Sequence, residues 1–166
     1  MMGCGMDPFS AQLNDMLVNT YRSVLAIEEA MLVSFSGDKL SISEMHMIEA
    51  VGAAGPEGRT ITDIAQALAI SPPSVTMMVK RLEKKGFVVK ARCERDGRRI
   101  YVRLTETGHR ADVSHRYFHR QMVRSVGRSI PEEEKAALLH GLKALNAFFQ
   151  ERAAELVNSH DGGAAH

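Results

Sequence analysis

Cysteine and aromatic residues are scarce in this chain of 166 residues, which has two Cys, no Trp and only 5% aromatic residues. Cys4 and Cys93 lie far apart, so they form neither a disulfide framework nor a metal-binding spacing, and each is expected to be a reduced thiol. The chain lacks a run of about 18 apolar residues, and its start resembles no signal peptide. These absences predict a cytosolic protein.

Enzyme motifs are absent as well. The sequence has no phosphate-binding loop, no nucleophile elbow and no paired-carboxylate arrangement, so we expect neither catalytic residues nor a cofactor. Its composition, 45% apolar and 25% charged, is ordinary for a globular protein. The length suits a single unit, residues 1–166, with a hydrophobic core of its own.

The formal net charge of +1 conceals an uneven distribution of charge. Residues 80–103 contain ten of the 21 basic residues but three of the 20 acidic ones, for a net charge of +7. The rest of the chain holds eleven basic and seventeen acidic residues, for a net charge of −6. A neutral or acidic body with one cationic segment is typical of a nucleic-acid-binding protein.

Apolar residues recur at helical spacing through most of the chain. Thr60 and Ser71 are expected to cap two short helices joined by a tight turn, and Gly86 to end the second of them. We expect a disordered tail over 158–166. The other predicted helices cover residues 7–35, 44–53, 105–126 and 132–157.

Two short runs, 87–92 and 99–104, have strand character, and Asp96-Gly97 between them is a hairpin turn signal. Two short helices followed by a hairpin make a helix-turn-helix with a wing. The predicted fold is therefore mainly α with a small β-hairpin, and the winged helix-turn-helix covers residues 36–108.

The helix after Ser71 has the properties of a recognition helix. Its inward positions are apolar, whereas its outward positions carry short polar groups first and cations later, which suits contacts with base edges and phosphates. On the hairpin tip, Arg98 is the expected minor-groove probe, Asp96 orients it, and Arg95 and Arg99 contact phosphates. The other candidate DNA-contacting residues are Ser71, Ser74, Thr76, Met77, Lys80, Arg81 and Lys84.

The span "DGRRIYVRLTETG" resembles the wing signature of the MarR-type winged-helix regulators. The matching positions are Asp96, Arg98, Val102, Leu104, Thr105 and Gly108. "SPPSVTMMVKRLEKKGFV" is similar to the recognition helix of that family. Four further segments are most similar to the FabT-type repressors of fatty-acid synthesis genes: "LAIEEAML", "SISEMHMIEAVG", "HRYFHRQMV" and "EEEKAALLHGLKALNAFFQ".

The resemblance implies a homodimer that binds palindromic double-stranded DNA, with residues 7–35 and 109–157 as dimerisation helices. It further implies an acyl chain, delivered by acyl carrier protein, as corepressor, and an apolar tunnel to receive that chain. Arginines at 110, 116, 120 and 124 are available to an acidic carrier, although a solvated face explains them too. The candidate effector pocket comprises Met31, Met45, His46, Met47, His115, Phe118, His119 and Met122; ordinary core packing explains its apolar members equally well.

Other effectors remain open, either zinc or a small aromatic or lipophilic molecule. His115 and His119 stand four residues apart on one predicted helix and His46 lies on another, so a shared metal is conceivable. Arg110 and Ala111, however, stand where zinc-sensing relatives are expected to supply further ligands. We therefore predict no metal ligands and interpret the histidines as polar pocket or interface residues.

Overall fold

The computed structural model describes residues 6–36, 40–92 and 100–161. Its contacts divide the chain into two units, Met1–Tyr117 and Phe118–His166, which are described separately. No helix in the described part of the chain combines the length and the apolar character needed to cross a membrane.

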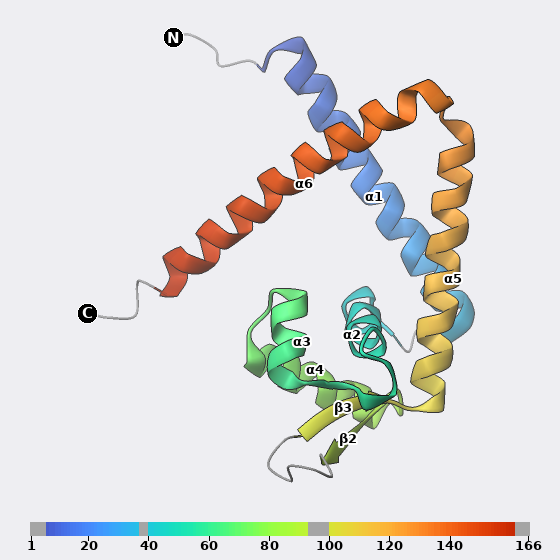
Figure 1. The fold of residues 1–166 in the computed structure, drawn as a ribbon, viewed down its shortest axis with the longest axis vertical. Helices are drawn as coiled ribbons and strands as arrows, with labels where there is room; N and C mark the ends of the chain where they lie inside the picture. The colour runs from blue at the N-terminus through green and yellow to red at the C-terminus, as the bar shows by residue number, and fades with distance from the viewer. Residues whose placement is uncertain (1–5, 37–39, 93–99, 162–166) are drawn as a thin grey trace. The chain divides into compact units, whose positions relative to one another are not determined.

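The first unit contains short helices and a small sheet, and Figure 1 shows α2, α3 and α4 gathered beside strands β2 and β3. A long helix, α1, precedes them, and α5 follows and continues into the second unit. The elements are α1 (Pro8–Ser36), α2 (Ile42–Gly52), the 3-10 turn η1 (Gly55–Glu57), β1 (Arg59–Thr60), α3 (Ile61–Leu68), α4 (Pro72–Lys84), β2 (Val88–Arg92), β3 (Ile100–Leu104), α5 (Glu106–Ser129) and α6 (Glu132–Asp161).

The sheet is antiparallel with the strand order β1-β3-β2. Val88 pairs with Leu104, and Lys90 with Val102, which confirms the predicted antiparallel pair of strands. The two-residue strand β1 was not predicted, because Arg59–Thr60 is too short to show any alternation. It pairs with the other edge of β3 and so joins the sheet to the helix-turn-helix.

Local capping explains where the short helices begin. The side chains of Thr60 and Ser71 accept hydrogen bonds from backbone N–H groups at the starts of α3 and α4, as predicted. Helix α2 starts two residues before the expected residue 44, because Ser41 and Glu44 form a capping box that the apolar pattern did not reveal.

The turn between α3 and α4 is stabilised by its backbone. Ala69 adopts the left-handed conformation, with φ of 53°, and it is the one non-glycine residue with positive φ in the described part of the chain. Its N–H bonds to the carbonyls of Ala65 and Gln66, and the N–H of Ile70 also bonds to Ala65. These bonds satisfy the last carbonyls of α3 and turn the chain into α4.

The core of the first unit is centred on α2, which contacts α1, α3, α4, η1 and β3. Burying each aliphatic side chain of this core stabilises the fold by about 1.5–3 kcal/mol. The fully buried apolar residues of this core are Met45, Met47, Ile48 and Val51 of α2, Ile64 of α3, Val75, Val79 and Leu82 of α4, Val88 of β2 and Val102 of β3.

The second unit consists of the end of α5 and the whole of α6. Helix α6 reaches Asp161, so residues 158–161 are helical where a disordered tail was expected. Asn158, Ser159 and His160 do not break a helix, and the first strong breaker is the Gly162-Gly163 pair. Residues 162–166 lie outside the described part.

The base of the wing is fixed by Thr105 and Gly108, two positions of the wing signature. The Thr105 hydroxyl donates to the carbonyl of Gly86 at 2.7 Å and accepts from the N–H of Gly108 at 3.0 Å. A Cβ on Gly108 would lie 2.0 Å from the carbonyl oxygen of Phe87. Glycine at 108 therefore permits the close approach of α5 to the start of β2.

An ion pair joins α2 to the end of α4. The Lys85 ammonium lies 2.7 Å and 2.6 Å from the two carboxylate oxygens of the buried Glu44. Burial opposes ionisation of Glu44, but the hydrogen bonds from Lys85 and Ser41 outweigh it, so the pKa of this carboxyl is lowered.

We predict that Glu44→Gln lowers the free energy of unfolding at neutral pH by about 1–3 kcal/mol, because the charge-assisted bonds to Lys85 are lost. Since the folded pKa is lowered, the wild-type advantage exists above the unfolded pKa and disappears as pH falls through the folded pKa. Urea unfolding at several pH values measures this difference in the free energy of unfolding. Glu106→Gln, in an exposed i,i+4 pair with Arg110, is the control and should change stability by under about 0.5 kcal/mol. Equal losses in the two variants would contradict the assignment.

We predict that Gly108→Ala destabilises the fold by about 1–3 kcal/mol, since the added methyl group meets a backbone carbonyl that cannot rotate away. Thermal unfolding followed by circular dichroism measures the change. Thr107→Ala, at the exposed neighbouring position of α5, serves as the control and should stay within about 0.5 kcal/mol of wild type. If Gly108→Ala were as stable as this control, the close approach of α5 to the start of β2 would contribute nothing to the stability of the fold.

Candidate nucleic-acid interface

Helix α4 presents a polar and cationic face to solvent. Val75, Val79 and Leu82 are fully buried, which orients the helix and leaves the opposite side exposed. Met77, Lys80, Arg81 and Lys84 are exposed and follow the i, i+3, i+4, i+7 spacing of a single stripe, with Ser74 one turn earlier. The structure thus brings the predicted recognition residues together on one face.

Six of the ten cations of residues 80–103 fall into two groups in the structure. Lys85, Lys90 and Arg103 form ion pairs with Glu44, Glu83 and Glu57 respectively. In contrast, Lys80, Arg81 and Lys84 form no ion pair with any residue in 6–36, 40–92 or 100–161. The second group has its charge available in full to a partner such as a phosphate.

The hydroxyl groups at the start of α4 make local hydrogen bonds. Ser71 and Ser74 lie 2.9 Å apart through their hydroxyl oxygens, and Ser71 also caps the helix. The Thr76 hydroxyl donates to the carbonyl of Pro72 at 3.0 Å, which places this side chain back along the helix. Their contacts with DNA remain predictions. The wing-tip candidates Arg95, Asp96, Arg98 and Arg99 lie outside the described residues.

The candidate effector residues divide between the units. Met45 and Met47 are fully buried in the hydrophobic core, with Met31 packed against it, whereas His46 is exposed. Phe118, His119 and Met122 are half-buried and fall in the second unit by sequence. Their role as an acyl-chain lining remains a prediction.

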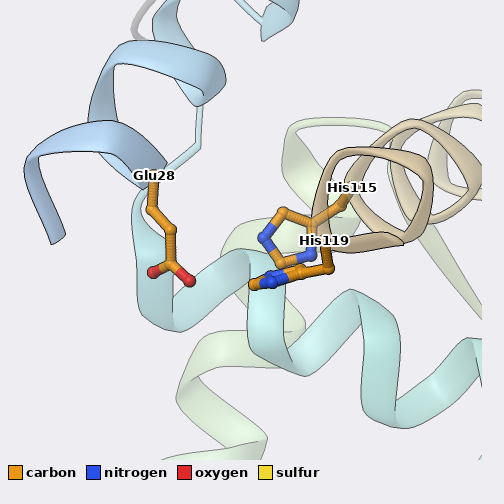
Figure 2. A group of neighbouring side chains, drawn as sticks. All are labelled: Glu28, His115 and His119. Carbon is orange, nitrogen blue, oxygen red and sulfur yellow. The ribbon is translucent and has the colours of Figure 1, made fainter. Parts of the chain in front are cut away.

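A buried polar cluster lies beside this core. Glu28 of α1 and His115 of α5 are buried, and His119 stands one turn after His115 on the same unbroken helix. Each of the three offers a potential ligand atom, and these atoms lie within 4.8 Å of one another. Figure 2 shows the carboxylate and the two imidazole rings as neighbours.

Both histidines were candidate residues in the sequence, whereas Glu28 was not among them. A usable signal was present, because Glu28 lies three or four residues from Val24, Leu25, Met31 and Leu32. A carboxylate within that apolar stripe is expected on the buried face of the helix. The structure also supplies Glu49 of α2, whose Oε1 lies 2.7 Å from Nδ1 of His115.

A second carboxylate is buried one turn before His115. Asp112 contacts the Arg116 guanidinium through Oδ2, while Oδ1 is the one buried side-chain polar atom without a hydrogen-bond partner in the described structure. Burial raises the pKa of Asp112, against the lowering effect of Arg116, and nearby Glu49 raises it further. Two carboxylates, Glu49 of α2 and Asp112 of α5, therefore lie near His115.

Solved structures with this fold include proteins captured on DNA. Streptococcus pneumoniae FabT in complex with DNA is 31% identical to this chain, with a TM-score of 0.79 over 86% of this chain and 98% of FabT. The S. aureus MepR-DNA complex covers 86% of this chain and 98% of MepR with a TM-score of 0.63. Its 21% identity supports the fold alone.

Sequence relatives include YfiV of Bacillus subtilis, an uncharacterized HTH-type transcriptional regulator, which is 34% identical over 87 residues, or 52% of this chain and 54% of YfiV. The HTH-type transcriptional regulator FarR of Neisseria gonorrhoeae is 44% identical over 46 residues, 28% of this chain and 32% of FarR. The chain thus spans about half the length of YfiV and less of FarR. These relatives are regulators, which confirms the predicted non-enzymatic class.

The sequence model of the MarR family matches residues 39–99, which include all of α2, α3, α4 and β2. The match coincides with the helix-turn-helix and the first strand of the wing, and the likeness to FabT extends it to both flanking helical regions. The chain is a member of the MarR family, with the winged helix-turn-helix fold and the FabT likeness that its sequence predicts.

Proposed function

We propose that this protein is a transcriptional regulator, most simply a repressor, that binds palindromic operator DNA as a homodimer. The observation that carries the proposal is the stripe of Lys80, Arg81 and Lys84, exposed and without ion pairs within the described residues. It lies on the helix that corresponds to the recognition helix of a winged helix-turn-helix. The FabT-DNA complex gives independent support.

The two ends of α4 are suited to different contacts with DNA. The short side chains at its start permit the close approach that base reading in the major groove requires, with Met77 available for apolar contact. The cations further along meet phosphates and set the register. The wing would place Arg98 in the minor groove, oriented by Asp96, with Arg95 and Arg99 on the flanking phosphates.

Exposed apolar side chains support the homodimer. On α1, Phe9, Met16 and Tyr21 are each more than half exposed, as are Leu139 and Phe149 on α6. Helices that display so many large apolar groups in a single chain are typical of an interface that a second copy covers. Two copies would present two recognition helices to half-sites about one helical turn apart.

We predict that Lys80→Ala weakens binding to a duplex from the upstream region of the protein's own gene by about tenfold. Because each dimer loses two phosphate contacts, the slope of log K against log salt should become shallower by about 1.8. Fluorescence anisotropy over a salt series measures both quantities. Lys143→Ala on the exposed side of α6 removes the same charge and should leave the slope unchanged. Wild-type affinity indifferent to salt would reject the DNA-binding proposal.

Arg98→Ala tests the wing in the same titration. It should weaken binding while the protein sediments as wild type does, since the hairpin tip is not part of the proposed dimer interface. An unchanged affinity for DNA would show that the hairpin tip is a charged turn that does not contact DNA.

Control of fatty-acid synthesis genes is the finer part of the proposal and rests on the resemblance to FabT-type repressors. Under it, an acyl chain presented by acyl carrier protein enters a pocket lined by methionines at 31, 45, 47 and 122, with Phe118. Met45 and Met47 already fill the core, so the chain would have to displace flexible side chains, for which methionine is suited.

We predict that long-chain acyl carrier protein tightens binding to a fatty-acid synthesis promoter in a gel shift. Carrier protein without an acyl chain is the control, because it has the same acidic surface but no apolar ligand. If the loaded and unloaded carriers act alike, the corepressor assignment is wrong while the DNA-binding function stands.

A further inference from the structure

We infer that Met77 is the specificity-determining residue of α4, and that it contacts the C5-methyl group of one thymine in each half-site of the operator. This role rests on the proposed DNA-binding function and specifies which chemical group of the DNA the helix reads. The position of Met77 on α4, the hydrogen bonds of its polar neighbours and the composition of the helix all support it.

Met77 lies at the centre of the solvent-facing side of α4, and its side chain is 53% exposed. Successive residues of an α-helix are rotated by about 100°, so Met77 is about 160° around the axis from each of the fully buried Val75 and Val79. On the exposed side, Lys80 and Arg81 are about 40–60° from Met77 in opposite directions. The two cations therefore flank the methionine.

This order of side chains fits the shape of the major groove. A helix that enters the groove with its exposed side foremost directs the central side chain at the base edges and the flanking ones at the phosphates. In a helix-turn-helix, bases are contacted from the first part of the recognition helix. Met77 is the sixth of the thirteen residues of α4, so it meets both requirements.

The polar side chains at the start of α4 are already engaged within the helix. The Thr76 hydroxyl donates to the carbonyl of Pro72, and the hydroxyls of Ser71 and Ser74 bind each other. A hydroxyl that exchanges such a bond for one to a base gains little, because one hydrogen bond replaces another. These residues are therefore weaker base readers than their position on the helix suggests.

Other side chains that commonly identify a base are absent from α4 or occupied. The helix contains no Asn or Gln, which recognise adenine through two hydrogen bonds. Its one acidic residue, Glu83, can accept from cytosine but is paired with Lys90 at 3.1 Å. Arg81 suits guanine or a phosphate. Apolar contact by Met77 is thus the means by which α4 recognises an A·T base pair.

Thymine matches the chemistry of this side chain. Its edge in the major groove carries a methyl group, whereas the purines present N7 and other polar groups there. A thioether against those polar atoms would exclude water without replacing its hydrogen bonds, which costs free energy. Against a methyl group, Met77 instead buries apolar surface on both partners, and its flexible chain adapts to the position of that group.

The test starts from the operator, which is determined by selection from duplexes with a random central segment. Each thymine of the selected site is then replaced by deoxyuridine, which lacks only the methyl group, and affinity is measured by fluorescence anisotropy. We expect one thymine per half-site to respond, with affinity about fourfold lower for one replacement and about 15-fold lower for both. If no replacement weakens binding, the role of Met77 is overturned.

Variants of α4 assign the effect to Met77. Met77→Ala should bind the operator more weakly and no longer distinguish thymine from deoxyuridine, whereas Met77→Leu, of similar volume, should retain most of the preference. Lys80→Ala is the matched control on the same helix, because loss of a phosphate contact should weaken binding to both duplexes equally. Discrimination that persists in Met77→Ala would assign the methyl contact to another side chain and overturn the inference.

Failure of this role is distinguishable from failure of the proposed function. If no duplex is selected and none binds with salt-dependent affinity, the DNA-binding proposal fails, and the role of Met77 fails with it. If the operator binds but is indifferent to its thymine methyl groups, only the role of Met77 is overturned. Cytosine and 5-methylcytosine at the responsive position test the same methyl group again. We expect the methylated duplex to bind more tightly to the wild type and equally to Met77→Ala; equal binding by the wild type would contradict the methyl contact.

Discussion

Helix α2 has to bury most of its surface while it carries two carboxylates, and the first unit depends on how these are accommodated. Met45, Met47, Ile48 and Val51 are fully buried, and this orientation leaves Glu44 buried and Glu49 only partly exposed. Glu44 is met by Lys85 from the end of α4 and Glu49 by His115 of α5. The same packing that forms the core therefore holds α4 and α5 at defined places around α2.

This arrangement explains why the basic segment is not uniformly available to a partner. A net charge of +7 in sequence suggests a single cationic patch, but Lys85, Lys90 and Arg103 neutralise acids of the protein itself. The remaining cations of α4 form a narrow stripe. A narrow stripe on a helix supports a defined register on DNA better than a diffuse patch, because each cation meets one phosphate position.

Much of the fold could be predicted from local signals. Thr60 and Ser71 cap helices in the structure as they do in the sequence interpretation, and the alternation in 99–104 identified β3. Strand β1 was not predicted because two residues are too few to show an alternating pattern. The start of α2 was predicted too late because its capping box precedes the apolar positions. Residues that act through distant contacts were the least visible. Glu28 and His115 are 87 positions apart, and only packing of α1 against the core reveals them as neighbours.

The backbone conformation of Ala69 restricts which residues can occupy position 69 of this helix-turn-helix. Its left-handed backbone is the geometry that lets α3 end and α4 begin after only three residues. Alanine tolerates that conformation at a cost of about 1–2 kcal/mol, glycine avoids the cost, and a β-branched residue suffers more. If α4 reads DNA as proposed, its exposed face can vary without disturbing this turn, while position 69 stays confined to a few small or asparagine-like residues.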